Sequence, residues 1–514
     1  MGVGRTRTVL GALAGLVAAA VALGVAELVA ALLRPEASPV VAVGGSVIDA
    51  TPTWLKEWAV ATFGTIDKPV LVGSVVGVLA LLALVTGALA VRNASAGLAG
   101  VAVLGLVGAA AAATRPEGRL LDPLPSVAGA AAGAVALLLV LRPLAEHDPE
   151  VPLADESRRQ VLVGLLAAGS VAVVAGTFGR LVTRRREGVT ASRAAVRLPA
   201  PVAAAEPLPR GTELPVRGLP PFTTPNDDFY RIDTALVVPQ VRTEGWELRV
   251  HGLVARELWL SWEDLLARDL VESDITLTCV SNDVGGSYVG NARWLGARLA
   301  DLLTEAGVRP DADMVLSRSA DGMTIGTPTA VVMDGRDALL AVGMNGEPLP
   351  VVHGFPCRMV VPGLYGYVSA TKWLVDLELT RFDRAEAYWT ERGWAEKGPI
   401  RTMSRIDTPR TFDRVRAGRV AVAGVAWAQH RGIAAVEVRV DGGPWQEARL
   451  ADVPSADTWR QWVWPWDARP GAHTLEVRAT DTDGVPQPER QRDPYPSGAT
   501  GWHAVTIRVD DTRT

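Results

Sequence analysis

The strongest constraint on this chain is a set of long apolar stretches confined to its first third. Each is near the roughly 20 residues that cross a bilayer as a helix. They lie at about residues 8–33, 69–91, 94–114, 126–141 and 160–182. The fourth is short, so a re-entrant or buried helix is the alternative to a crossing at that point. We therefore expect residues 1–185 to form an all-α transmembrane bundle of about five helices.

The composition of the whole chain agrees with this division. Apolar residues make up 48% and charged residues 21% of the 514 positions, which is more apolar than a soluble protein of this length. The 51 Lys and Arg against 56 Asp and Glu give a net charge of −5, which gives no sign of nucleic-acid binding. Two cysteines, Cys279 and Cys357, are too few for a cysteine-ligated iron–sulfur cluster, a four-cysteine zinc site or a disulfide framework.

The apolar stretches carry few groups that could do chemistry. None of the six histidines lies in them, and a b-type haem in a membrane usually needs paired histidines on facing helices. Glu27 is the only acid well inside an apolar stretch, so we expect an anchor rather than a proton or ion pathway. Trp54 and Trp58 lie four residues apart in the loop between the first two apolar stretches. They could hold a helix at the membrane interface.

Orientation follows from a motif rather than from charge counting. Arginine and lysine divide almost evenly between the two sides, so the positive-inside rule does not decide. The run SRRQVL at residues 157–162, with Arg158 and Arg159, resembles an internal twin-arginine export signal, which serves proteins exported in the folded state. A pair of ordinary cytoplasmic flanking arginines is the alternative. We take the N-terminus as inside and the part after residue 185 as extracytoplasmic at the cell membrane.

Beyond the apolar third, the pattern becomes that of globular domains. Residues 186–225 are rich in Pro, Ala, Arg and Glu without a sustained period and indicate a linker. Residues 226–405 mix β-branched runs with short helices, as in a mixed α+β domain. From residue 406 to 514 short strands alternate with turns, which predicts an Ig-like β-sandwich of roughly 100 residues.

Candidate chemistry gathers in the α+β part. Cys279 ends a β run and a polar, Gly-containing loop follows, so a thiolate there could reach a transition metal. A buried structural thiol is the alternative. His353, Arg358 and Lys372 are interleaved with turn residues and a strand, and such groups converging from loops suit a phosphate or an anionic cofactor. Arg231 follows two aromatic residues upstream.

Taken together, these segments resemble the sulfite oxidase family of molybdenum enzymes. The resemblance rests on the order and spacing of FYR at 229–231, TLTCVSN at 276–282, ARWLGARLADLL at 292–303, SADG at 319–322, MNGEPLP at 344–350, HGFPCR at 353–358, VVPGLYG at 360–366 and KWL at 372–374. The sandwich resembles the family's dimerisation domain, so the similarity covers roughly residues 226–510. The five-segment anchor with its internal twin-arginine signal resembles membrane-bound members of this group.

The resemblance implies a molybdenum–molybdopterin cofactor and two-electron oxygen-atom transfer. It implies that Cys279 supplies the protein's sulfur ligand to molybdenum and that Arg231 faces the substrate oxyanion. His353, Arg358 and Lys372 fall on positions that hold the pterin and its phosphate. The other positions that fall on cofactor-lining segments are Phe229, Tyr230, Asp233, Ser319 and Asp321. Cys357 has no counterpart, and we interpret it as a core thiol.

Two departures from the family pattern bear on the substrate. Trp394 stands where sulfite oxidases carry a substrate-pocket tyrosine, with Tyr388 six residues too early. Ile232 and Asp233 replace an Asn-His pair after Arg231, and a negative charge at Asp233 would oppose a sulfite dianion. The resemblance therefore supports the cofactor and the reaction type more firmly than it supports sulfite as the substrate.

The sequence leaves the partners and the direction of the reaction open. It offers no second redox centre, so we expect an external electron partner, either a cytochrome or a quinone-linked protein. The resemblance also suggests a homodimer through the sandwich. A reductase of S-oxides such as methionine sulfoxide is as consistent with the sequence as an oxidase. A non-catalytic binding or scaffold protein with a degenerate molybdopterin domain is a further hypothesis, and retention of the cationic and thiol residues argues against it.

Overall fold

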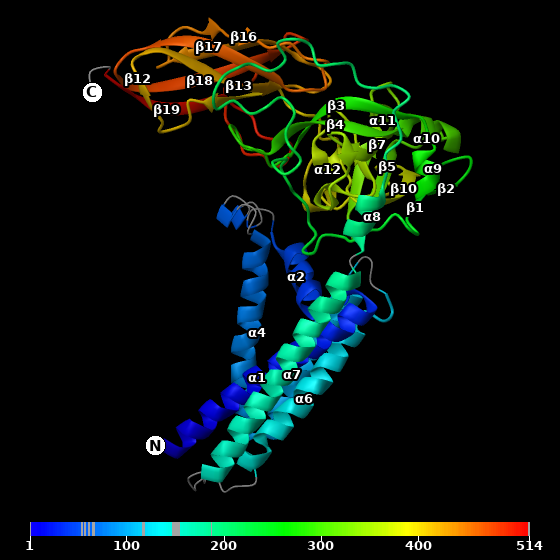
Figure 1. Ribbon diagram of the computed structural model, residues 1–514, viewed down its shortest axis with the longest axis vertical. Helices are drawn as coiled ribbons and strands as arrows, with labels where there is room; N and C mark the ends of the chain where they lie inside the picture. Colours follow the sequence, from blue (N-terminus) through cyan, green and yellow to red (C-terminus); the bar gives the residue numbers. More distant parts are fainter. Residues whose placement is uncertain are drawn as a thin grey trace. The chain divides into compact units, whose positions relative to one another are not determined.

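The chain forms two compact units, one of helices and one containing the strands (Figure 1). The computed structural model describes residues 2–52, 55, 58–59, 62–63, 67–115, 119–145, 155–186 and 188–511. The helical unit comprises Met1–Gly188 with Thr234–Val238, and the second unit comprises Val189–Asp233 with Pro239–Thr514. The predicted fold class is therefore confirmed: apolar helices first, then a mixed α/β domain and a C-terminal β-sandwich.

Five helices of the first unit are long and apolar enough to cross a membrane. They are α1 (Gly2–Leu33), α4 (Asp67–Arg92), α5 (Ala94–Ala113), α6 (Leu124–Ala145) and α7 (Asp155–Arg186). Their apolar spans match the five predicted stretches, and the fourth, expected to be short, belongs to a 22-residue helix. A 3-10 turn, η1 (Pro35–Ala37), and the apolar helix α2 (Pro39–Ala50) lie between α1 and α4 and were missed by the pattern.

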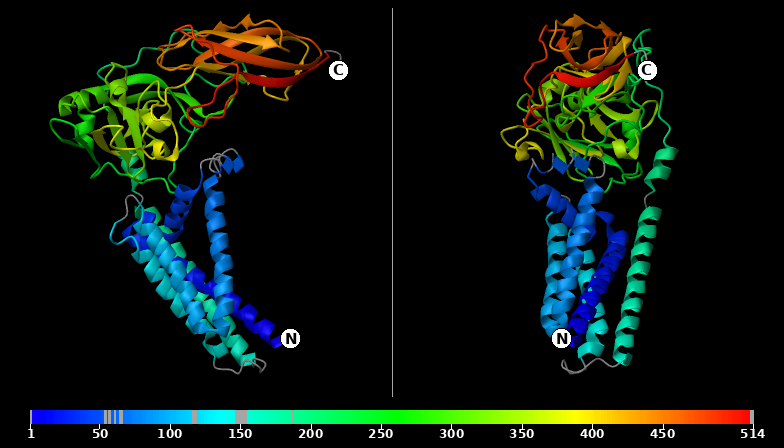
Figure 2. Two further views of the ribbon diagram at one scale, coloured as in Figure 1. Left: turned by 180° about the vertical axis from the view of Figure 1, so that it is seen from behind. Right: turned by 90° about the vertical axis from the view of Figure 1, so that its left-hand side faces the viewer.

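The long helices run alongside one another (Figure 2). They meet through small residues. Helix α1 contacts α4, α6 and α7. A methyl group at Gly87 of α4 would overlap the Gly11 carbonyl oxygen and lie 2.6 Å from the Gly15 Cα. At Gly129 of α6 it would lie 2.5 Å from the Ala22 carbonyl oxygen. Close backbone approach at Gly and Ala is the usual basis of helix packing in membranes.

The structure describes most of the single residues that the sequence analysis named in this unit. Trp54 lies outside the described residues, whereas Trp58 is exposed and stacks edge-on against Phe63 with ring centroids 5.6 Å apart. Glu27 accepts a hydrogen bond from the Ser38 hydroxyl. Arg158 and Arg159 fall within α7, and their role in export stays a prediction.

The linker expected over residues 186–225 is wrong for most of its length. Helix α8 (Val189–Ala195) forms there, and Val189, Leu214 and Phe222 are 1%, 5% and 1% exposed. The Phe222 carbonyl oxygen accepts a hydrogen bond from the indole of Trp459 at 2.9 Å. The apolar residues of this segment pack at separate places on the folded domains, for example Leu214 against Ala423 and Val463, and they follow no helical or strand period.

The mixed α/β domain is built on two five-stranded sheets. One has the order β2-β1-β10-β5-β6, with β1 parallel to β10, and the other runs β3-β4-β7-β8 with β9 added to β7. The strands are β1 (Glu247–Gly252), β2 (Leu258–Ser261), β3 (Leu270–Thr278), β4 (Val289–Arg298), β5 (Met314–Ser319), β6 (Thr324–Pro328), β7 (Leu339–Met344), β8 (Glu347–Pro348), β9 (Arg358–Val360) and β10 (Leu374–Thr380).

Short helices and turns connect these strands. They are α9 (Trp262–Leu266), α10 (Leu299–Ala306), α11 (Thr329–Val332), η3 (Val351–His353), α12 (Gly366–Ser369) and η4 (Thr390–Arg392). Helix α9 begins with a capping box, in which Ser261 accepts from the Asp264 N–H and the Asp264 carboxylate accepts from the Ser261 N–H. The short helices expected among the strands of this domain are thus confirmed.

The C-terminal part is a sandwich of two sheets, drawn in orange and red in Figure 1. The sheets have the orders β11-β13-β17-β16 and β12-β19-β18-β14-β15. The strands are β11 (Met403–Thr408), β12 (Arg414–Arg416), β13 (Gly418–Trp427), β14 (Ile433–Val440), β15 (Gln446–Glu447), β16 (Arg449–Leu450), β17 (Arg460–Ala468), β18 (Gly471–Asp481) and β19 (His503–Asp510). Alternate inward residues such as Val436, Leu475 and Val477 fill the space between the sheets.

The close approach at Gly87 gives a testable prediction for the helical unit. Gly87→Leu should lower the thermal unfolding midpoint of the full-length protein in detergent, because overpacking of a close contact costs about 1–3 kcal/mol. Gly77 lies on the same helix, and a methyl group added there would have nothing within 4 Å, so Gly77→Leu is the matched control. Equal midpoints for the two variants would contradict the packing described.

Candidate functional site

Cys279 occupies the first position after β3, where the buried strand turns into a loop. Its thiol side chain is 9% exposed. The Cys279 N–H donates to the Tyr288 carbonyl oxygen at 2.9 Å, and its own carbonyl oxygen accepts from the Asn282 N–H at 3.1 Å. Burial raises the pKa of the Cys279 thiol. The position is therefore fixed at both backbone groups while its sulfur atom makes no disulfide.

The sandwich holds the strand that ends at Cys279. Gln429 Nε2 donates to the Thr276 carbonyl oxygen at 3.1 Å and to Thr278 Oγ1 at 2.9 Å. The Trp459 N–H donates to Thr276 Oγ1 at 2.7 Å. Arg405 Nη1 donates to the Gly286 carbonyl oxygen, in the loop after Cys279, at 2.6 Å. Sequence reasoning missed these supports, because contacts between domains leave no local pattern.

His353, Arg358, Lys372 and Arg231 form a cationic group in the mixed α/β domain. His353 is 4% exposed and its Nε2 donates to the Asn226 carbonyl oxygen at 3.0 Å. Burial lowers the pKa of His353 to about 4, and the charges of Arg358, Lys372 and Arg231 also act to lower it. The structure thus brings these four predicted residues together, with His353 neutral at ordinary pH.

Arg358 is the most deeply buried of the three cations Arg231, Arg358 and Lys372. It is 5% exposed, its Nη1 donates to the His353 carbonyl oxygen at 3.1 Å, and its guanidinium lies 5.0 Å from the Trp294 ring centre. Among the described residues its Nε has no hydrogen-bond partner. Burial lowers the pKa of Arg358 to about 10. Its contacts are with carbonyl oxygens and an aromatic face, so they do not supply a compensating negative charge.

Asp233 lies between two of the cations. Its Oδ2 accepts from Arg231 Nε and from Lys372 Nζ, each at 2.8 Å, and its side chain is 3% exposed. Burial lowers the pKa of Lys372 to about 8, although the Asp233 carboxylate acts in the opposite direction. The negative charge of Asp233 is thus paired with Arg231 and Lys372, and its effect on a substrate dianion stays a prediction.

Aromatic side chains enclose the cationic group and reach the thiol. Phe229 stacks on Tyr230 at 5.3 Å and meets the His353 ring edge-on at 5.6 Å. Burial raises the pKa of Tyr230, negative charge on Cys279 would raise it further, and Arg358 lowers it. Tyr365 has its pKa raised to about 12, chiefly by burial, with Cys279 also contributing. Both phenols thus lie within electrostatic reach of Cys279, and Tyr365 was missed in the sequence.

Ser319 is the last residue of β5, and Asp321 lies in the turn that connects β5 to β6. The Ala320 N–H donates to the Trp373 carbonyl oxygen at 2.8 Å, so this turn lies beside the residue that follows Lys372. Asp321 Oδ1 accepts from the Met323 N–H at 3.4 Å. The structure places both residues near the cationic group, and their contact with a cofactor stays a prediction.

Trp394 belongs to an aromatic cluster next to this region. It is 4% exposed and its ring lies 5.9 Å from Tyr367, 6.3 Å from Trp389 and 5.4 Å from Tyr495. Tyr367 is in α12, whose first residue, Gly366, faces Tyr230. The role of Trp394 at a substrate pocket stays a prediction.

Cys357, the second thiol, lies apart from this chemistry. It is fully buried in the main hydrophobic core, and burial raises the pKa of its thiol. These surroundings are in keeping with the core thiol expected from the sequence.

The cations and the thiol of this site fit an anionic cofactor that itself supplies most of the ligands to a metal. Arg231 and Lys372 share the carboxylate of Asp233, whereas Arg358 contacts carbonyl oxygens and the Trp294 ring. A buried cation without a counter-charge costs several kcal/mol. Within the described ranges no group of three or more His, Cys, Asp or Glu side chains could hold a metal ion. Cys279 could therefore offer one soft ligand, and the remaining ligands would come from the bound group.

Comparisons with known proteins agree with this chemistry. A family model described as "Oxidoreductase molybdopterin binding domain" matches residues 235–389. The mitochondrial sulfite oxidases of Rattus norvegicus and Homo sapiens are 29% and 31% identical over 340 residues, which are 56% of this chain and 62% of each relative. The chain thus spans about three fifths of the length of these relatives.

A bacterial relative and a solved structure are also similar to this chain. The "Uncharacterized oxidoreductase YuiH" of Bacillus subtilis is 37% identical over 153 residues, covering 30% of this chain and 74% of that protein. The crystal structure of the sulfane dehydrogenase SoxCD from Paracoccus pantotrophus has a TM-score of 0.50 at 23% identity, covering 62% of this chain and 94% of that one. This last similarity concerns the fold alone.

The shared carboxylate predicts a large effect of its removal. Asp233→Asn should destabilise the cofactor-free full-length protein by about 3 kcal/mol, because it leaves buried cations without their partner. Thermal unfolding of protein made in cells unable to synthesise molybdopterin measures this. Asp227→Asn, which changes an exposed carboxylate of the same segment, is the control and should have no effect. If both variants unfold like the wild type, Asp233 does not hold the cations.

Proposed function

Because the chain belongs to the sulfite oxidase family of molybdopterin-binding oxidoreductases, we propose that it binds a molybdenum–molybdopterin cofactor and catalyses two-electron oxygen-atom transfer on an anionic sulfur substrate. The observation that carries the proposal is a buried thiol, Cys279, near a buried cationic group: Cys279 and Arg358 both act on the pKa of Tyr230, and Arg231 and Lys372 share the carboxylate of Asp233. The cofactor, when bound, supplies the metal centre that exchanges the oxygen atom and the electron pair.

Each residue of the site has a physical task in this proposal. Cys279 is the protein's sulfur ligand, and the metal charge would remove the thiol proton that burial otherwise retains. Arg358, Lys372 and His353 hold the anionic pterin, with Arg358 Nε free to donate to it. Phe229, Tyr230, Ser319 and Asp321 line the cofactor, and Arg231 attracts the substrate oxyanion.

The pairing of Asp233 favours an anionic substrate over a neutral S-oxide. Asp233 would oppose a dianion if its charge were unpaired, but Arg231 and Lys372 each lie 2.8 Å from its Oδ2. The side chain of Arg231 is 35% exposed, so its guanidinium has access to solvent as well as to Asp233. Oxidation of sulfite with water gives sulfate, two protons and two electrons, and the electron pair passes to an external acceptor.

The helical unit is proposed to anchor this activity at the membrane. Five helices are long and apolar enough to cross a bilayer, and an odd number of crossings places the two ends of the unit on opposite sides. With the N-terminus inside, the part after α7 is extracytoplasmic. The twin-arginine motif at Arg158 and Arg159 would export it in the folded state, with its cofactor already bound.

Turnover tests the proposed reaction. Full-length protein loaded with cofactor should oxidise sulfite with ferricyanide as the electron acceptor, and Cys279→Ala should lose at least about 99% of this activity because the metal loses its protein ligand. Cys357→Ala, which changes the buried core thiol, is the matched control and should keep its turnover. Reduction of methionine sulfoxide by reduced viologen, with no sulfite oxidation, would instead establish the reductase. Full activity in Cys279→Ala would contradict the ligand role.

Export tests the proposed orientation. Changing Arg158 and Arg159 both to Lys should keep the catalytic part inside the cell, because the twin-arginine pathway requires the arginine pair. A reporter fused to the C-terminus and active only outside the cytoplasm measures this. Arg142→Lys, in α6, is the control and should leave export unchanged. Undiminished reporter activity in the double variant would show that another signal directs the topology.

A further inference from the structure

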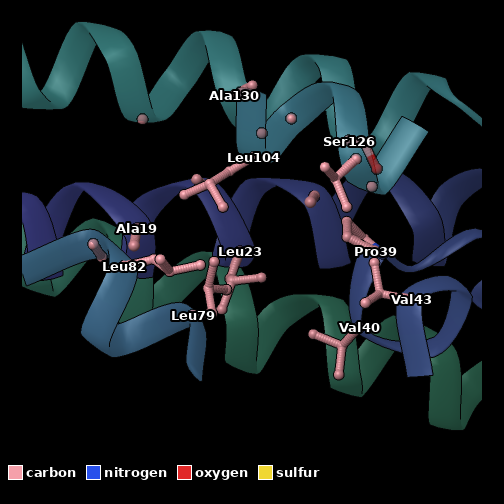
Figure 3. A pocket seen from close by; sticks show the side chains of 18 of the residues that line it. Ala19, Leu23, Pro39, Val40, Val43, Leu79, Leu82, Leu104, Ser126 and Ala130 are labelled. Atoms are coloured by element: carbon pink, nitrogen blue, oxygen red, sulfur yellow. The ribbon is translucent and has the colours of Figure 1, made fainter. Parts of the chain in front are cut away.

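The helical unit contains an apolar cavity with one unpartnered hydroxyl group at its polar end. The cavity has a volume of about 460 Å³ and is lined by α1, α2, α4, α5 and α6. Figure 3 shows Ala19, Leu23, Leu79, Leu82 and Leu104 around it. Small-molecule sites typically enclose about 300–1,000 Å³. The cavity is thus large enough for a ring with part of a hydrocarbon chain.

Ser126 distinguishes this cavity from a mere packing defect. The lining residues are apolar or Gly apart from Ser74, Thr86 and Ser126. The Ser74 hydroxyl donates to the Val70 carbonyl oxygen at 2.8 Å. Ser126 is 4% exposed, and its hydroxyl has no hydrogen-bond partner among the described residues. A buried, unpaired hydroxyl costs about 1–3 kcal/mol, so a ligand with a hydrogen-bond acceptor would be stabilised there.

The surroundings of Ser126 define the polar end of the cavity. Gly108 faces the Ser126 hydroxyl, since a methyl group there would lie 2.8 Å from Oγ and 3.4 Å from the Pro39 Cβ. Figure 3 shows Ser126 and Pro39 at one end of the cavity and Ala19 and Leu82 at the other. Nearby carboxylates are already engaged, because Ser38 donates to Glu27 and Arg34 Nη1 lies 3.3 Å from Asp122 Oδ2.

The polar end also lies toward a defined membrane face. Ser126 is near the start of α6 and Pro39 is the first residue of α2. Because consecutive spanning helices alternate in direction, both lie on the face at which α1, α5 and α7 end. A ligand with its head at Ser126 would therefore lie near that face, with its hydrocarbon tail directed toward the bilayer centre.

We propose that this cavity binds an isoprenoid quinone, with the Ser126 hydroxyl donating a hydrogen bond to a quinone carbonyl oxygen and the apolar wall holding the first part of the tail. The choice of a quinone rests on the proposed function. Oxidation of one sulfite by water releases two electrons and two protons, and a quinone takes up the same numbers to become a quinol. A phospholipid acyl chain would fill the apolar wall but would leave Ser126 unpaired.

Photolabelling of the full-length protein in detergent tests the site. An azidoquinone with a ten-carbon tail should label peptides of the cavity helices, and excess decylubiquinone should compete while phosphatidylcholine should not. Ser126→Ala should weaken competition by decylubiquinone about three- to tenfold, the loss expected for one hydrogen bond. Ala19→Phe, which fills the apolar end, should abolish labelling.

A matched control and an independent assay separate this proposal from the proposed function. Ser170 lies on α7 outside the cavity lining, and its hydroxyl donates to the Leu166 carbonyl oxygen at 2.9 Å, so Ser170→Ala should label like the wild type. All these variants should oxidise sulfite with ferricyanide at the wild-type rate. Equal labelling of Ser126→Ala, Ala19→Phe and the wild type, or competition by phosphatidylcholine, would overturn the quinone site even if ferricyanide-linked turnover is normal. Specific labelling without any turnover would support the site and count against the proposed reaction alone.

Discussion

The site depends on positive charge buried with too little negative charge to balance it. Arg358 has carbonyl oxygens and the Trp294 ring as its contacts, while Arg231 and Lys372 share the single carboxylate of Asp233. Burial and the same field lower the pKa of His353 to about 4 and keep that ring neutral. An arrangement of this kind is costly in the free protein and favourable once an anion is bound, so the protein is organised around its cofactor.

The second requirement is that one thiol be held at a fixed point beside this charge. The β-sandwich meets it through Gln429 and the Trp459 N–H on β3, and through Arg405 on the loop after Cys279. The sandwich therefore has a part in positioning Cys279, the proposed metal ligand. The helical unit, by contrast, is held by close contacts at Gly11, Gly15 and Gly87, where a larger side chain could not fit.

Much of the fold and of the candidate site could be predicted from the sequence, but the signal differs between the helical unit and the site. Apolar length predicted the spanning helices, and local motifs predicted that Cys279, His353, Arg358 and Lys372 belong to one site. The pattern missed α2, which is too short for a spanning stretch, and took residues 186–225 for a linker because their contacts are scattered. It did not predict the pairing of Asp233 with Lys372, since these residues lie 139 positions apart in the chain. Tyr365 and Gln429 were missed for the same reason, because only the fold brings them to Cys279 or its strand.

The central claim is that Cys279 is the protein's ligand to a molybdenum ion held in this cationic site. X-ray absorption at the molybdenum edge, on full-length protein and on Cys279→Ala, tests it most directly. We expect about one molybdenum per chain in the wild type. It should have three sulfur neighbours, two from the molybdopterin and one from Cys279. In Cys279→Ala we expect either loss of the metal or two sulfur neighbours. Three sulfur neighbours in the variant, or a folded wild-type protein that takes up no molybdenum in cells able to make the cofactor, would contradict it.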